Sequence, residues 1–216
     1  MKYQDRINFY IVNRSTEDSI KDVYSPLTND FALIINENFY FSFIEEINNG
    51  GLFFDQSLQF YSFTEERDYR NIAVVNETFK REYKGLFNRL VAFAQDVFGN
   101  QFAFNTLENC IVLFNIETAE QRIIADSFED WLVMIEEDLD YLAGLSYARK
   151  WKKYHNLGLD QRILPEVPFV IGGEYSLENF DISTFPYYIS YNAQLAKQIF
   201  NLKDGENIEL VIKKKQ

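Results

Sequence analysis

Four short apolar runs and the helical pattern that follows them, within residues 90–139, constrain the fold more than any other stretch of this chain. The first two runs lie within residues 90–104 and the next two within residues 111–124. Gly99 and Asn100 tolerate the positive φ angles of a tight hairpin turn. Short apolar runs separated by turn residues are typical of strands joined by hairpins, so this stretch predicts an antiparallel meander.

A helix is expected directly after this meander. The Ser127 hydroxyl is placed to accept a hydrogen bond from the backbone N–H of Asp130, as in a helix N-cap. Apolar residues then recur at helical spacing on one face, namely Phe128, Trp131, Leu132, Ile135 and Leu139. The helix is therefore predicted to pack on the sheet. A hairpin with an amphipathic helix is a common scaffold and does not by itself indicate a function.

The rest of the chain gives weaker patterns. We expect a strand at 7–12, a helix from 36 to 47, one or two strands within 52–61, a helix from 76 onward, a helix at 192–200 and a strand at 208–212. The composition turns basic after residue 142, where we place a boundary. The residues by themselves predict an acidic α+β protein.

The charge of the chain bears on its partners. Its 216 residues carry a formal net charge of -12 at pH 7. Sequence-independent nucleic-acid binding depends on Lys and Arg that neutralise phosphates, so it is disfavoured. An acidic surface suits a basic protein partner, because opposite charges speed association. Acidity that serves only solubility explains the same composition and is the simpler alternative.

Cysteine usage and the amino end indicate a compartment. Cys110 is the single cysteine, so no intramolecular disulfide can form. The first twelve residues carry charges where a signal peptide has an apolar core. No run approaches the roughly 20 apolar residues of a membrane-spanning helix. We therefore expect a soluble, cytoplasmic protein.

Residues capable of catalysis or metal binding are few or ambiguous. His155 is the only histidine, and one His with one Cys cannot supply a usual zinc site. Pairs such as Glu117 and Glu120 could hold a hard cation or act as acid and base, but a solvated surface is the simpler explanation. The Gly50-Gly51 and Gly172-Gly173 pairs lack the spacing of phosphate-binding loops and indicate turns.

Three segments in order resemble the SMI1/KNR4 (SUKH) superfamily. The first is the helix that runs into Asn48-Asn49-Gly50-Gly51, the second is the segment 90–104, and the third is the helix start at 125–132. The resemblance spans roughly residues 29–142. The segments 167–180 and 193–206 are similar to an extension found in some bacterial members of this superfamily.

The resemblance implies a fold, a domain division and a role. The implied fold is α+β, with a mainly antiparallel or mixed sheet of about four to six strands backed by helices. The implied division is a SUKH-like domain at 1–142 and a small C-terminal α/β extension at 143–216 packed on it. Bacterial members are similar to immunity proteins that neutralise a toxin domain, often a nuclease, whereas fungal relatives resemble regulators of cell-wall synthesis. It implies no catalytic residue, cofactor or metal.

Acidity then suggests a hypothesis about the partner-binding surface. Nuclease toxins hold phosphates in basic clefts, so an acidic inhibitor could imitate the nucleic acid. The candidate contact residues are Glu65, Glu66, Asp68, Glu136, Glu137, Asp138 and Asp140. Two alternatives stay open: a regulatory or scaffold protein that binds an endogenous partner, and an enzyme that uses clustered carboxylates with a divalent ion.

Overall fold

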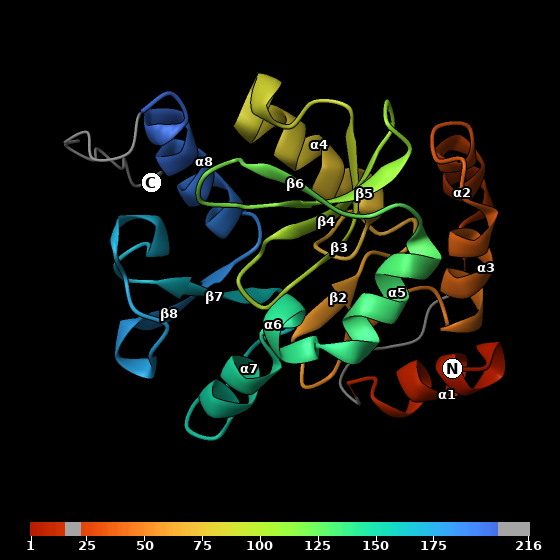
Figure 1. The fold of residues 1–216 in the computed structure, drawn as a ribbon, viewed down its shortest axis with the longest axis horizontal. Helices are drawn as coiled ribbons and strands as arrows, with labels where there is room; N and C mark the ends of the chain where they lie inside the picture. The colour runs from red at the N-terminus through yellow and green to blue at the C-terminus, as the bar shows by residue number, and fades with distance from the viewer. Residues whose placement is uncertain (16–22, 203–216) are drawn as a thin grey trace.

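A six-stranded antiparallel sheet in simple sequence order forms the centre of the molecule (Figure 1). The computed structural model describes residues 1–15 and 23–202. The strands are β1 Gly51–Phe53, β2 Leu58–Phe60, β3 Leu90–Gln95, β4 Gln101–Asn105, β5 Cys110–Phe114 and β6 Gln121–Ala125. Each strand pairs with the next one along the chain, which confirms the predicted meander and the α+β class.

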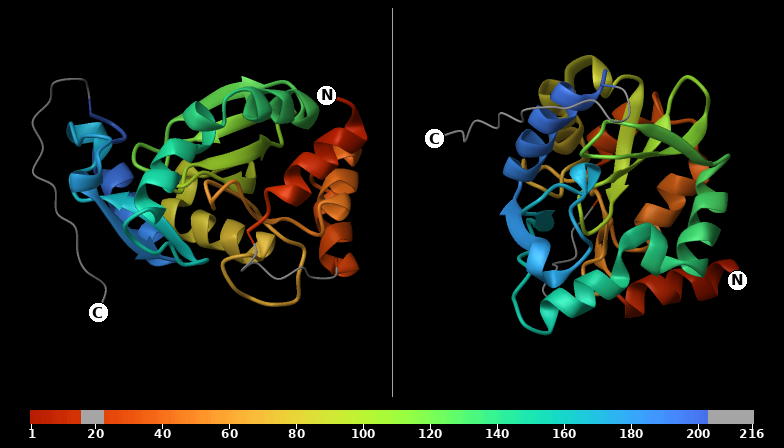
Figure 2. Two further views of the ribbon diagram at one scale, coloured as in Figure 1. Left: turned by 90° about the horizontal axis from the view of Figure 1, so that it is seen from below. Right: turned by 60° about the vertical axis from the view of Figure 1, so that its left-hand side comes forward.

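Helices cover both faces of this sheet, and α4 and α5 lie on opposite sides of it (Figure 2). The helices are α1 Tyr3–Val12, α2 Ser25–Ala32, α3 Asn38–Glu46, α4 Ile72–Tyr83, α5 Phe128–Glu137, α6 Leu139–Ala143, α7 Leu145–Lys152 and α8 Tyr187–Ile199. A separate two-stranded sheet joins β7 Gln161–Pro165 to β8 Phe180–Thr184. Short 3-10 turns lie at η1 Lys84–Leu86, η2 Phe169–Ile171 and η3 Leu177–Asn179. Within the described residues, no helix is both long and apolar enough to cross a membrane.

The face of the sheet under α5 is an aromatic core. Cross-strand partners point to the same face, so Phe60 and Phe102, which both pair with Ala94, lie beneath Trp131. Phe93 reaches the same face at the register shift between Ala92 and Ala94. The ring centroids of Phe60, Phe93 and Phe102 lie 5.6, 4.9 and 5.0 Å from that of Trp131. Ser127 begins α5 as expected, because its hydroxyl accepts from Asp130 N at 3.1 Å. The predicted cap is therefore confirmed, and so is the buried face formed by Phe128, Trp131, Leu132 and Ile135. Leu139, which we predicted on the same helix, lies beyond the end of α5 and is half-buried.

The opposite face packs on α4, and α8 packs against α4. The register of β3 against β4 shifts between Ala92 and Ala94. At that irregularity the Asn76 side chain of α4 donates to Ala92 O at 2.9 Å and accepts from Ala92 N at 2.8 Å. The amide side chain of Asn76 thus pairs with both backbone groups of Ala92.

A buried arginine joins the small sheet to the large one. Arg162 of β7 is 1% exposed, and its guanidinium donates to the Gln59 side chain of β2. The backbone N–H of Ile163 donates to Val97 O at 2.9 Å, directly after β3. Leu142, where we predicted the domain boundary, lies inside α6, and the division into two domains stays a prediction.

Several predicted elements differ from the structure. Residues 7–12 form part of α1 rather than a strand, because Arg6, Ile7 and Tyr10 are buried on one helical face. Helix α4 begins at Ile72, where the Asn71 side chain accepts from two backbone N–H groups, and not at residue 76. Similarly, α8 begins at Tyr187 instead of residue 192. The strand predicted at 208–212 lies outside the described residues.

Candidate functional site

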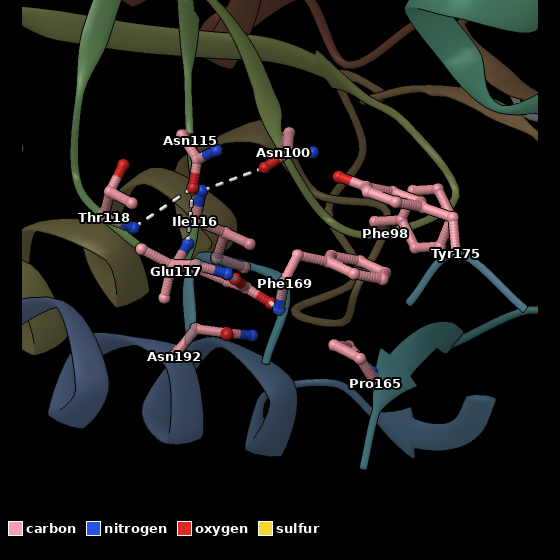
Figure 3. Close-up of a pocket in the computed structure, with 11 residues that line it drawn as sticks. Phe98, Asn100, Asn115, Ile116, Glu117, Thr118, Pro165, Phe169, Tyr175 and Asn192 are labelled. Atoms are coloured by element: carbon pink, nitrogen blue, oxygen red, sulfur yellow. Dashed lines mark hydrogen bonds between the residues drawn. The ribbon is translucent and has the colours of Figure 1, made fainter. Parts of the chain in front are cut away.

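A groove lies where two turns of the large sheet meet the C-terminal part of the chain. It contains two adjoining pockets of about 260 and 640 Å³, which share Phe98, Asn100, Asn115 and Tyr175 as lining residues. Figure 3 shows the smaller pocket between the sheet turns, the segment around Phe169 and helix α8. The groove therefore combines residues that are far apart in the sequence.

The β3–β4 turn is built around the Asp96 carboxylate. Its Oδ1 accepts from the backbone N–H groups of Phe98 and Asn100, both at 2.9 Å, and its Oδ2 accepts from Asn100 Nδ2 at 2.8 Å. Burial raises the pKa of Asp96 to about 7, although these hydrogen bonds and the Arg162 charge favour the ionised form. Asn100 Oδ1 also accepts from Ile116 N at 3.0 Å, so the two sheet turns are held together.

The β5–β6 turn places a second buried carboxylate at the groove. Asn115 Oδ1 accepts from the backbone N–H groups of Glu117 and Thr118, which fixes the turn. The Glu117 carboxylate then accepts from Phe169 N at 3.1 Å and from Val170 N at 2.8 Å. Burial raises the pKa of Glu117, and the two backbone hydrogen bonds oppose that rise. Glu117 thus fixes the segment that carries η2.

That segment presents apolar side chains from a rigid backbone. The Asn179 side chain accepts from Val167 N at 2.8 Å and donates to Val167 O and Glu174 O, both at 3.0 Å. The rings of Phe169 and Tyr175 stack at a centroid distance of 3.8 Å. The exposed apolar side chains of this segment are Val167, Val170, Ile171 and Tyr175, which we call the apolar loop. Exposed apolar groups on an ordered segment are typical of a binding surface.

Two of the predicted acidic residues line the larger pocket. Asp138 caps α6 by accepting from Tyr141 N at 2.9 Å, and Asp140 accepts from Ser146 N at 2.6 Å. Tyr147 contributes an aromatic wall to the same pocket. This end of the groove therefore combines two acidic groups and an aromatic ring with the cationic side chain of Arg122.

The other predicted acidic residues are dispersed. Glu136 lies against Arg6, with Oε1 at 2.6 Å from Nε and both side chains under 10% exposed, so its charge is used inside the fold. Glu66 and Asp68 form ion pairs with Arg70 in the connection before α4. The last two, Glu65 and Glu137, are exposed. The structure thus brings only part of the predicted acidic set to the groove.

Metal-binding and histidine chemistry have little support in the described residues. No group of three or more His, Cys, Asp or Glu in residues 1–15 and 23–202 is arranged to hold a metal ion. His155 is exposed and stacks on Trp151 at a centroid distance of 4.3 Å, as a surface histidine would. What the groove offers is carboxylates, side-chain amides and aromatic rings, which suit binding.

Sequence reasoning identified the turns but not the groove that they form. Glu117 stood out only as one of several paired carboxylates, and the apolar loop stood out only as a short apolar run between prolines and glycines. One local signal was available: Val167-Pro168-Phe169-Val170-Ile171 has no polar residue, which is unusual for a surface connection. Nothing in the sequence indicates that this segment meets Glu117, about fifty residues earlier.

Comparisons with known proteins agree with this architecture. The crystal structure of Atu4351 from Agrobacterium tumefaciens is similar, with a TM-score of 0.61 and 18% sequence identity over 89% of this chain and 88% of that one. At that identity the likeness describes the fold alone. No curated protein matches the chain. Residues 38–134, from the start of α3 into α5, match the SMI1/KNR4 family (SUKH-1). This match supports membership of the chain in the SMI1/KNR4 (SUKH) family through this segment.

Proposed function

We propose that this protein is a non-enzymatic immunity protein that binds and neutralises the toxin domain of a polymorphic or contact-dependent toxin system. Membership of the SMI1/KNR4 family supports a role in protein interaction. The toxin in this proposal is basic, such as a nuclease. Neutralisation occurs by stoichiometric binding in the cytoplasm and requires no cofactor.

The single observation that carries this proposal is the groove with its apolar loop. Stable protein interfaces combine a well-packed apolar and aromatic centre with a polar rim. Here the apolar loop supplies the centre, since Val170 and Ile171 are 42% and 45% exposed. Asp138 and Asp140 supply acidic groups beside it.

The charge of the chain favours a basic partner for this surface. A net charge of -12 attracts a cationic protein over a distance of about one Debye length, roughly 8 Å at physiological salt. Exposed Glu65 and Glu137 contribute to that field, as do Glu66 and Asp68 around Arg70. Glu136 contributes less at the surface, because it is buried against Arg6.

Co-expression with a toxin tests the proposal. The toxin domain encoded beside this protein should arrest growth alone, and this protein should restore growth and co-purify with it. Val170→Asp and Ile171→Asp should each weaken the complex at least about tenfold, because they place a charge in the centre of an interface. Leu107→Asp is the matched control, since Leu107 is also exposed but lies in the β4–β5 turn.

Growth rescue, partner capture and thermal melting together separate the alternative functions. Absence of rescue, combined with capture of an endogenous partner by the apolar loop, would favour a regulatory or scaffold protein. A melting temperature that rises by several degrees with Mg²⁺, Mn²⁺ or Ca²⁺ would favour an enzyme that uses a divalent ion. Equal growth rescue by the Val170→Asp and Leu107→Asp variants would show that the apolar loop is not part of the interface with the toxin.

A further inference from the structure

We propose that the smaller pocket of the groove receives one cationic side chain of the partner, a lysine ammonium or an arginine guanidinium. The inference rests on the proposed function, because it assumes that the groove meets a protein. It adds the chemistry of one anchor residue on that partner. Three features of the pocket carry it: a buried anion, an unused acceptor and an aromatic wall.

The buried anion is Glu117. The residue is 6% exposed, and its carboxylate accepts from the backbone N–H groups of Phe169 and Val170. Within residues 1–15 and 23–202, no lysine, arginine or histidine forms an ion pair with it. Burial of a carboxylate without a counter-charge is unfavourable, and a cation beside it would compensate that charge. An incoming ammonium or guanidinium would supply that charge.

The unused acceptor is the side-chain oxygen of Asn192. The residue is 1% exposed, and its Nδ2 donates to Tyr188 O at 2.9 Å, which sets the orientation of the amide. Its Oδ1 consequently has no hydrogen-bond partner among the described residues. Figure 3 shows Asn192 on α8, next to Glu117, at the wall of the pocket. Glu117 and Asn192 thus line one pocket from different elements, and each carries an acceptor oxygen.

The opposite wall is aromatic. Phe98, Phe169 and Tyr175 line the pocket, and the Phe98 and Phe169 rings meet edge to face at 5.3 Å. Aromatic faces attract cations within about 6 Å of the ring centroid. The pocket volume of about 260 Å³ is below the roughly 300–1,000 Å³ of sites for drug-sized ligands. The space therefore fits one side chain rather than a larger molecule.

Blocked amino acids test the pocket without any toxin. In a ¹⁵N NMR titration of the full chain, N-acetyl-arginine-methylamide or its lysine counterpart should bind with a Kd of about 1–10 mM, as expected for a small fragment. The shifted signals should be the backbone amides of Glu117 and Val170 and the side-chain amide of Asn192. The neutral citrulline counterpart should bind at least about tenfold more weakly. Equal binding of citrulline and arginine would refute the inference.

Three variants assign the effect to the pocket. Glu117→Gln should lower arginine affinity at least about tenfold, whereas Glu120→Gln should leave it unchanged. Glu120 is an exposed acid of the same turn, so the two variants lose the same charge. Asn192→Leu removes the unused acceptor without touching η2, and it should also weaken arginine binding. It therefore tests the pocket independently if Glu117→Gln disturbs the segment that carries η2. If neither the Glu117→Gln variant nor the Asn192→Leu variant changes the affinity for the blocked arginine, the assignment to this pocket is overturned.

A free small cation is the other source of this chemistry. Agmatine carries a guanidinium without a peptide backbone, and an affinity at least about tenfold above that of the blocked arginine would contradict a partner side chain. The pocket and the immunity role can fail separately. Growth rescue without arginine binding would refute only the proposed binding of a cation in the pocket. Arginine binding without growth rescue would refute only the immunity role.

Discussion

Glu136→Gln should destabilise the fold rather than weaken partner binding, because Glu136 compensates a buried arginine. The side chains of Arg6 and Glu136 are 4% and 8% exposed, and Nε and Oε1 lie 2.6 Å apart. Loss of one partner from a buried ion pair costs about 3–5 kcal/mol. Glu129 remains 3.7 Å from Arg6 Nη1, but it is 65% exposed, so solvent screening limits its compensation to about 1 kcal/mol. Glu136→Gln should therefore lower the free energy of unfolding by about 2–4 kcal/mol.

Thermal and urea unfolding measure this loss. For a chain of this size, each kcal/mol lowers Tm by about 2–4 °C, so Glu136→Gln should lower Tm by roughly 4–16 °C. The matched control is Glu137→Gln, an exposed neighbour expected to change stability by less than about 0.5 kcal/mol.

A double variant tests the reasoning itself. Arg6→Met with Glu136→Leu replaces the ion pair by apolar side chains, and its stability should lie within about 1 kcal/mol of the wild type. Glu136→Gln that is as stable as Glu137→Gln would refute a structural role for the pair. So would a double variant that loses as much as the two single variants combined.

Three further predictions concern pH, a helix cap and a glycine. Because the folded pKa of Asp96 is raised to about 7, the folded state holds a proton that the unfolded state releases. Stability should therefore fall as pH rises from about 4 to about 7 and level off above that, by at most about 1.4 kcal/mol per pH unit from this group, and urea titrations of Asp96→Asn should show a flatter dependence. Ser127→Ala should cost about 1 kcal/mol in urea unfolding through loss of the α5 cap, and an unchanged midpoint would contradict that role. Gly144→Ala should cost about 1–3 kcal/mol, because φ is +69° and a Cβ would lie 2.8 Å from the Val97 side chain, whereas Gly85→Ala has open space and should be nearly neutral.

Much of the fold could be predicted because it depends on residues close together in the sequence. The Gly99-Asn100 turn, the Ser127 cap and the helix face with Trp131 each involve a few consecutive residues, and all three occur in the structure. Hairpins place neighbouring strands side by side, so the order of β3 to β6 followed from their turns. The structure of short apolar segments was harder to predict. Residues 7–12 fit a strand pattern weakly, but they form part of helix α1, because a helix buries Arg6, Ile7 and Tyr10 on one face.

The sequence by itself determined the meander, the α5 helix, the acidity and the resemblance to a family. Only the tertiary structure decided which acidic side chains are buried in contacts within the fold and which are exposed to a partner. Glu136 pairs with Arg6 across 130 residues, and Glu117 meets Phe169 across 52. Backbone propensity and capping act within a few residues, whereas burial and ion pairing depend on which distant surfaces come into contact. For that reason the acidic composition was evident at once, but the groove that makes part of it available to a partner became visible only in the folded chain.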